Sequence, residues 1–187
     1  MLKNFCRWLI WSLITLTSLL CCATWFVTAD VTGSSMYPTF RDGDFVLCLR
    51  KSKITHSDIV AIYSDELNKI ICKRVIGLPG DSVVISGNTV SVNGAVLSES
   101  YLKDLHWSEK LNVKVPDEAL FLLGDNRSDS RDSRELGCLP IHNVRGICVL
   151  DITKVFGLTR DGFKIILPFI WVVVLVGGFR RGKQATD

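Results

Sequence analysis

The hydrophobic positions of the chain gather in two long runs, one near each end, with a mixed polar region between them. The first run, residues 8–27, carries no charged side chain and has about the 20 residues that a helix needs to cross a bilayer. The second run, residues 163–179, is about 17 residues long and contains Pro168, at the short end of the spanning range. We therefore expect a transmembrane helix in each run, with a buried or interfacial helix as the alternative for the second.

The charges beside these runs predict how the chain crosses the membrane. Two basic residues precede the first run and three follow the second: Lys3, Arg7, Arg180, Arg181 and Lys183. Because basic residues favour the cytoplasmic side, residues 1–7 and 180–187 are expected in the cytoplasm and residues 28–160 outside it. A cleaved signal peptide is the alternative for the first run, but its apolar region would usually span only about 7 to 15 residues. An uncleaved anchor is therefore favoured.

Between the two runs, short stretches rich in Val, Ile and Leu alternate with turn residues. The predicted strands are residues 44–50, 58–63, 69–76, 81–85, 89–92 and 119–123. Ser86-Gly87-Asn88 and Asn93-Gly94 are typical hairpin turns, because Gly and Asn tolerate a positive φ. The pattern predicts a mostly β protein, in which residues 28–160 form a single antiparallel sheet or barrel-like domain.

Composition supports a membrane protein. Hydrophobic residues make up 48% of the chain and the mean hydropathy is +0.28, which is high for a soluble domain. The net charge of +3 comes from 22 basic and 19 acidic residues, an excess too small to indicate a nucleic-acid partner.

Two residues of the central region are candidates for covalent catalysis. Ser35 lies in the segment Gly33-Ser34-Ser35-Met36-Tyr37-Pro38-Thr39, and a serine hydroxyl becomes a strong nucleophile only when a base takes its proton. Lys73 lies in an apolar, strand-forming stretch, where burial would lower its pKa and leave it neutral. The adjacent Arg74 stays protonated and cannot act as a base. We therefore interpret Ser35 and Lys73 as a catalytic pair.

Four blocks, in this order, resemble the sequence boxes of bacterial type I signal peptidase, peptidase family S26. They are residues 33–39, Gly43-Asp44, residues 73–81 and residues 124–134. The resemblance spans roughly Phe26 to Asp151. It implies a membrane-bound serine endopeptidase that cuts N-terminal signal peptides from exported preproteins at the outer face of the bacterial cytoplasmic membrane. The family pattern places the nucleophile immediately before Met36, which selects Ser35 over Ser34.

The resemblance also implies roles for the residues around the pair. Asp125 would form an ion pair with Arg74, Asp132 would pair with Arg134, and Ser130 would orient the lysine. The Ser35 N–H would be the first oxyanion donor. Some relatives carry a serine hydroxyl as second donor where this chain has Gly33, so a backbone N–H or water would replace it here.

The expected substrate pocket accepts small side chains, typically alanine, near the cleavage point. By resemblance, Val31, Thr32, Met36 and Cys72 would line it. The preprotein and the lipid bilayer are thus the expected partners.

The cysteines and histidines indicate neither a metal nor a cofactor. Seven cysteines are present, and Cys138 with Cys148 or Cys48 with Cys72 could form a disulfide in the outer domain. None has metal-ligand spacing, and the three histidines lie far apart. We therefore expect no cofactor.

Three other functions are consistent with parts of the pattern. The same chemistry would suit a dedicated maturation peptidase for pilus or conjugation proteins. A catalytically silent homologue could act as an assembly factor, but such a protein would be expected to lack the base, and Lys73 is present. A self-cleaving Ser-Lys regulator of the LexA type is disfavoured because it has no use for membrane anchors.

Overall fold

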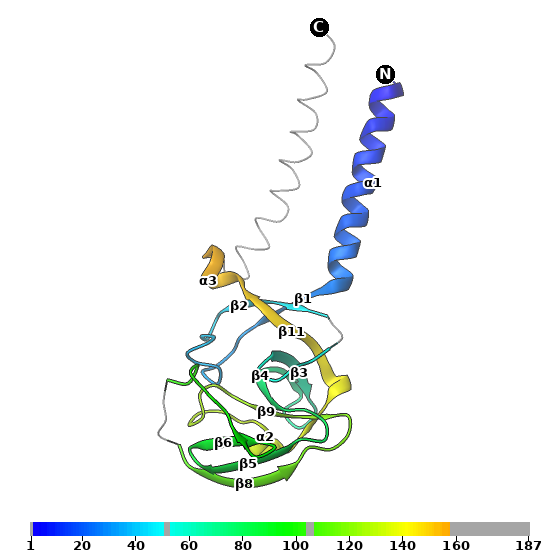
Figure 1. Cartoon of the computed structure of the whole chain (residues 1–187). Coiled ribbons are helices and arrows are strands. Elements are labelled where there is room, and N and C mark those ends of the chain that lie inside the picture. Colours follow the sequence, from blue (N-terminus) through cyan, green and yellow to red (C-terminus); the bar gives the residue numbers. More distant parts are fainter. Residues whose placement is uncertain (1, 51–52, 104–106, 158–187) are drawn as a thin grey trace.

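A computed structural model of the chain describes residues 2–50, 53–103 and 107–157, apart from the side chains of residues 2–5, 7, 18–24 and 156. Helix α1 (Leu2–Trp25) projects from a body built of antiparallel strands (Figure 1). The second apolar run, 163–179, and the tail, 180–187, lie outside the described residues, so their predicted topology stays a prediction.

The strands form two sheets. The larger has seven strands, in the order β1 (Phe26–Asp30), β2 (Phe45–Leu49), β11 (Val144–Asp151), β3 (Ile59–Ser64), β4 (Lys69–Gly77), β9 (Ala119–Leu123) and β10 (Leu139–Pro140). The smaller has four, in the order β7 (Ala95–Val96), β6 (Thr89–Val92), β5 (Ser82–Gly87) and β8 (Glu109–Lys114). Every described pairing is antiparallel.

The prediction of a single sheet or barrel-like domain was wrong in two respects: the strands form two sheets, and the larger sheet does not close into a barrel. The turn at residues 77–81 separates β4 from β5, and β5 pairs with β6 and β8 instead of continuing the first sheet. The seven-stranded sheet stays open, because β1 and β10 each pair with one neighbour only. The mostly β, antiparallel class is confirmed.

Six strands follow their sequence patterns closely. The bounds of β6 and β9 match the prediction, and β2, β3, β4 and β5 differ from it by at most two residues at either end. Strand β11 was missed although it lies in the middle of the larger sheet, between β2 and β3. Gly146 interrupts its apolar pattern because a Cβ there would lie 3.0 Å from the Leu49 carbonyl oxygen, a close approach of two backbones.

Buried apolar side chains fix the strands that lead to the blocks at residues 73–81 and 124–134. All five residues of β9 are buried, and Phe121 and Leu123 pack with Ile76, Val83 and Ile85 between the two sheets. The opposite side of β9 packs on a second cluster around β3 and β4. Strand β9 therefore delivers the loop that follows it to a defined place.

Three short helical turns complete the body. Helix α2 (Ser133–Leu136) begins after Asp132, whose carboxylate accepts a hydrogen bond from the Arg134 N–H and caps the helix. A 3-10 turn, η1 (Ile141–Asn143), links β10 to β11, and α3 (Ile152–Phe156) follows β11.

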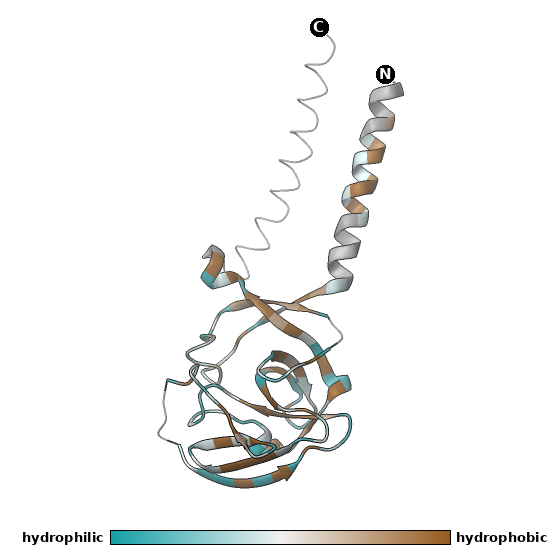
Figure 2. Cartoon of the chain, viewed as in Figure 1, coloured by the Kyte–Doolittle hydropathy of each residue, from teal (hydrophilic) through white to brown (hydrophobic). Residues whose placement is uncertain are grey.

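Hydrophobic residues recur along the described part of helix α1 (Figure 2). Its exposed apolar side chains include Trp8, Ile10, Trp11 and Leu13. Among the described residues, no helix combines the length and the apolar character that crossing a membrane requires.

Neither of the two disulfides that the sequence left open is formed among the described cysteines. All five whose side chains are described are free thiols. The antiparallel register places Cys148 opposite Cys48, with their sulfur atoms 3.1 Å apart, so neither Cys138–Cys148 nor Cys48–Cys72 is the facing pair.

We predict that Phe121→Ala lowers the free energy of unfolding by about 3–5 kcal/mol, because it leaves a cavity where both sheets meet. Urea denaturation followed by fluorescence would measure the loss. Val96→Ala is the control, since Val96 is 68% exposed and its truncation should change stability by less than about 0.5 kcal/mol. Equal effects of the two changes would contradict a core centred on Phe121.

Candidate active site

The loop between β1 and β2 presents Ser35. Its ends are tied together by hydrogen bonds from the Val31 N–H to the Asp44 carbonyl (2.8 Å) and from the Gly43 N–H to the Val31 carbonyl (2.9 Å). The Met36 side chain is buried and anchors the loop in the core. Ser35, one residue earlier, is therefore held at a fixed point at the rim of this core.

Strand β4 brings the predicted base to Ser35. The Lys73 Nζ lies 2.7 Å from the Ser35 Oγ, to which it donates a hydrogen bond. Lys73 is only 3% exposed, and this burial lowers the pKa of its amine below the usual 10.5. The nearby carboxylate of Asp132 opposes the shift, but burial dominates. The geometry and the lowered pKa together allow Lys73 to accept a proton from Ser35.

The adjacent Arg74 is locked in a different role. Its Nε and Nη2 donate to the two oxygens of Asp125 at 2.7 and 2.6 Å, and its Nη1 donates to the Ser57 carbonyl at 2.9 Å. Thr39 donates a further hydrogen bond of 2.5 Å to Asp125, which is 1% exposed. The structure thus contains the expected Arg74–Asp125 ion pair. Together with Thr39, this pair connects β4 to the loop between β1 and β2 and to the loop after β9.

That second loop, residues 124–134, is organised by Asp132. The Gly124 N–H donates to the Asp132 Oδ2 at 2.9 Å, and Arg134 donates to both oxygens of Asp132 at 2.8 and 2.9 Å. Arg127 closes the loop with a 3.0 Å hydrogen bond from its Nε to the Gly124 carbonyl. The expected Asp132–Arg134 pair is therefore present as well.

Ser130 differs from expectation. Its Oγ is buried and makes no hydrogen bond within the described part of the chain, so the expected bond to Lys73 is not formed. Ser130 instead packs against Gly124, where a Cβ would lie 2.1 Å from the Ser130 Oγ and 2.5 Å from the Ser35 carbonyl oxygen. Only a glycine at 124 leaves room for both serines to lie this close to the backbone at that position.

Gly33 contributes through its backbone. It adopts φ +86°, which glycine tolerates best, and its N–H donates to the Asp42 Oδ1 at 2.7 Å. This N–H is therefore already engaged within the loop.

The four residues expected to bind substrate do not share one environment. Val31 and Met36 are buried in one apolar cluster, and Cys72 packs against it half-buried. Thr32 is exposed. Their contact with substrate stays a prediction.

Four residues near the pair were missed by sequence reasoning. The Asn126 N–H donates to the Ser35 carbonyl at 3.0 Å, and the Ser34 hydroxyl donates to the Asp129 carboxylate. Tyr101 lies with its ring 3.9 Å from the Arg74 guanidinium and donates to Glu99, which in turn pairs with Arg127. Asn126 and Asp129 lie inside a block already singled out, whereas Glu99 and Tyr101 lie in a segment without a distinctive pattern.

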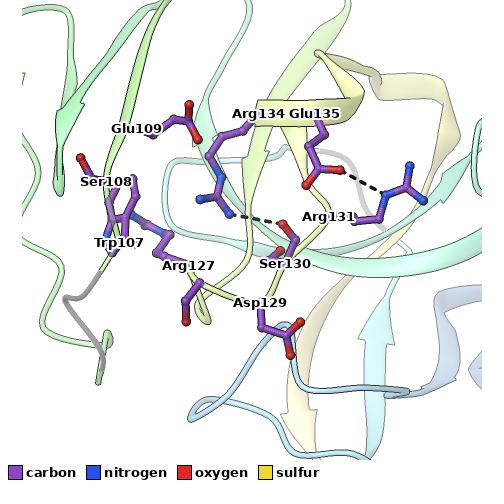
Figure 3. Close-up of a pocket in the computed structure, with 10 residues that line it drawn as sticks. Trp107, Ser108, Glu109, Arg127, Asp129, Ser130, Arg131, Arg134 and Glu135 are labelled. Carbon is purple, nitrogen blue, oxygen red and sulfur yellow. Dashed lines mark hydrogen bonds and ion pairs between the residues drawn. The ribbon is translucent and has the colours of Figure 1, made fainter.

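A polar hollow of about 660 Å³ lies beside this site (Figure 3). Trp107, Arg127, Asp129, Ser130 and Arg134 are among the residues that line it. Its lining includes neither Ser35 nor Lys73, so the predicted catalytic pair does not line this hollow. Within the described residues, no group of three His, Cys, Asp or Glu side chains is arranged to hold a metal ion.

Comparison with known proteins gives consistent matches. The family model described as "Signal peptidase, peptidase S26" matches residues 3–152. Signal peptidase I of Bacillus licheniformis is 38% identical over 131 residues, which cover 62% of this chain and 70% of that protein. Signal peptidase I V of Bacillus subtilis is 32% identical over 139 residues, covering 65% of this chain and 83% of that protein.

A crystal structure of a signal peptidase I from Enterococcus faecalis is also similar, with 31% identity and a TM-score of 0.49 over 52% of this chain and 98% of that one. The family match covers most of the chain, and the Bacillus relatives are matched over more than two thirds of their length. The chain therefore belongs to the signal peptidase family, peptidase S26, and is a serine endopeptidase.

Proposed function

We propose that the protein cleaves N-terminal signal peptides from exported preproteins, with Ser35 as the nucleophile and Lys73 as the general base. The observation that carries this proposal is the 2.7 Å contact between the Lys73 Nζ and the Ser35 Oγ, made by a lysine that is 3% exposed. The names of the family and of the relatives supply the substrate class.

The reaction proceeds in two halves. Neutral Lys73 takes the hydroxyl proton of Ser35 as the Oγ attacks the scissile carbonyl carbon, and the Ser35 N–H donates to the oxyanion that forms. The ammonium of Lys73 then gives its proton to the leaving amine of the mature protein, which departs and leaves an acyl-enzyme. A water molecule, deprotonated by the same lysine, hydrolyses the ester and releases the signal peptide.

The surroundings of Lys73 affect its ability both to accept the proton of Ser35 and to hold it. Burial lowers the pKa of the Lys73 amine, which favours the neutral form that the reaction needs. The carboxylate of Asp132 raises the pKa of Lys73, so it stabilises the ammonium that forms during attack. Arg74 cannot replace Lys73, because its guanidinium is held by Asp125 and stays protonated.

We further propose that residues 8–27 anchor the domain in the membrane, with residues 28–160 on the outer face. The absence of charge in 8–27 and the exposed apolar side chains of α1 support an anchor. The basic residues at 3 and 7 support a cytoplasmic amino terminus, and those within 180–187 support a cytoplasmic tail after a second span at 163–179. Such an anchor would hold the active site close to substrates that are themselves in the bilayer.

The first prediction concerns the catalytic pair. Ser35→Ala and Lys73→Ala should each lower kcat by about 10³-fold or more, because each removes a group that the chemical step requires. Ser34→Ala should keep activity within about tenfold, because it removes a single hydrogen bond worth about 1 kcal/mol. The assay is cleavage of a preprotein with an Ala-x-Ala site by the full chain in detergent.

Equal loss in all three variants would contradict the assignment of Ser35. A preprotein panel that includes pilus and conjugation proteins distinguishes the general peptidase from a dedicated one. Cleavage of the general substrate by the wild type would exclude the silent homologue.

The second prediction concerns pH. Since Lys73 must be neutral to act, kcat/KM should rise as pH rises through the pKa of Lys73, and burial places this midpoint below 10.5. The measurement is a pH profile with a substrate that carries no group titrating in the same range. A midpoint at or above 10.5 would show that the lysine is not desolvated in solution.

The third prediction concerns the anchor. In a chain cut after residue 160, which removes the second proposed span, the double change Leu13→Arg and Leu16→Arg should release the protein from membranes into the carbonate wash, because each charge placed in the bilayer costs about 2.5–3.5 kcal/mol. The same shortened chain without the double change should stay in the membrane pellet. Val96→Arg, on the exposed surface of the β-domain, is the control and should leave membrane retention unchanged. Retention of the double variant would contradict an anchor at 8–27.

A further inference from the structure

One residue of the loop after β9 binds both carbonyl groups that flank the Ser35 amide. The backbone N–H of Asn126 donates to the Ser35 carbonyl at 3.0 Å, and its side-chain Nδ2 donates to the Ser34 carbonyl at 3.2 Å. We propose that Asn126 is a positioning residue that aims the Ser35 N–H at the oxyanion. This inference rests on the proposed function.

Peptide geometry links the Ser34 carbonyl to the Ser35 N–H. The two groups belong to the same peptide unit, which is planar. The cis peptide bond of the described residues is Tyr37–Pro38, so the Ser34–Ser35 bond is trans. In a trans peptide the carbonyl and the N–H point in opposite directions. The Ser34 carbonyl accepts from the Tyr37 N–H at 2.9 Å within its own loop and from the Asn126 Nδ2 at 3.2 Å. The Asn126 side chain is thus the second donor to this carbonyl, and it helps to turn the Ser35 N–H away from the loop after β9.

The Ser35 N–H is available for this task. Within the described residues it donates no hydrogen bond, whereas the N–H of Gly33 is engaged by Asp42. Gly33 has no side chain that could add a hydroxyl donor. Because an oxyanion donor must lie about 2.7–3.1 Å from the developing charge, the direction of this one N–H decides how well it acts.

Asn126 is itself held in one orientation. Its Oδ1 accepts a hydrogen bond from the Ser128 hydroxyl at 3.1 Å, which leaves the Nδ2 as the end that faces Ser34. Its carbonyl accepts from the Asp129 N–H at 3.1 Å. Asp129 in turn accepts from the Ser34 hydroxyl, so the two loops are tied at a second point. The Ser34–Ser35 peptide is thus fixed against a rigid partner.

The test replaces the donor of Asn126 with an acceptor of the same shape. Asn126→Asp keeps the backbone contact to Ser35 but places a carboxylate oxygen against the Ser34 carbonyl, which repels it. We expect kcat to fall about 10²-fold with KM within twofold, and Asn126→Ala to lower kcat about tenfold. Asn112→Asp is the matched control, because it makes the same charge change on an exposed strand position and should leave kcat unchanged.

Two inhibitors distinguish a role of Asn126 in positioning the oxyanion donor from a general effect on the structure of the site. The Ser35 Oγ adds to the carbonyl of a peptide aldehyde and forms a hemiacetal whose oxygen lies where the oxyanion forms, whereas the corresponding peptide alcohol has no carbonyl to attack and forms no oxyanion. In Asn126→Asp, the Ki of the aldehyde should rise about as much as kcat/KM falls, while the Ki of the alcohol stays within twofold. A structural defect would weaken both inhibitors or lower the melting temperature.

Each of the following results would contradict the proposed role of Asn126 or the proposed function. Unchanged kcat and aldehyde Ki in Asn126→Asp, with an active wild type, would overturn the inference alone. Equal weakening of the aldehyde and the alcohol would also overturn it, in favour of a structural role. If the aspartate variant does not fold, Asn126→Ala decides by the same ratio of inhibition constants. A wild type that does not cleave the preprotein overturns the proposed function, and this inference with it.

Discussion

The burial of one amine beside one hydroxyl is the constraint on which the site depends. Lys73 and Arg74 are consecutive cations of β4, and both are buried. Moving an ion out of water costs several kcal/mol unless it is paired and hydrogen-bonded. Arg74 meets this requirement through Asp125, whereas the described ion pairs include none to Lys73. The strand therefore stabilises the charge of Arg74 and lowers the pKa of Lys73, and Lys73 is the group that can act as a base.

The two carboxylates of the loop after β9, Asp125 and Asp132, are arranged so that neither is left as an unpaired charge near Lys73. Asp125 and Asp132 are both almost fully buried, and each is matched by an arginine that donates to both of its oxygens. Both carboxylates raise the pKa of Lys73 against the effect of burial. Pairing each one with Arg74 or Arg134 limits this effect, so the ion pairs support the lowered pKa of the base as well as the shape of the loop.

Local sequence patterns predicted most of the strands, but they could not predict which distant strands pair with one another. Strands β6 and β9 were identified by their apolar runs and turn residues, but β11 was missed because it is only half-buried, bulged and interrupted by Gly146. Ser35 and Lys73 were paired from residue chemistry and a family resemblance, whereas the ion pairs followed from the resemblance alone. Asn126, whose role depends on its distance to two backbone carbonyls, could not be inferred from spacing. The facing of Cys48 and Cys148 likewise depends on a register set by the whole sheet.

Two glycines of the site are needed for different physical reasons, and the difference bears on the oxyanion donor. Gly124 lacks the space for a Cβ, whereas Gly33 has nothing within 4 Å of a Cβ position but adopts φ +86°. A side chain at 33 would meet no clash, but it would incur the cost of the left-handed conformation, about 1–2 kcal/mol. A hydroxyl donor at this position therefore conflicts with the loop conformation observed here. With no hydroxyl donor at 33, the proposed oxyanion donor is the main-chain N–H of Ser35, and the side chain of Asn126 contacts the carbonyl of the same peptide.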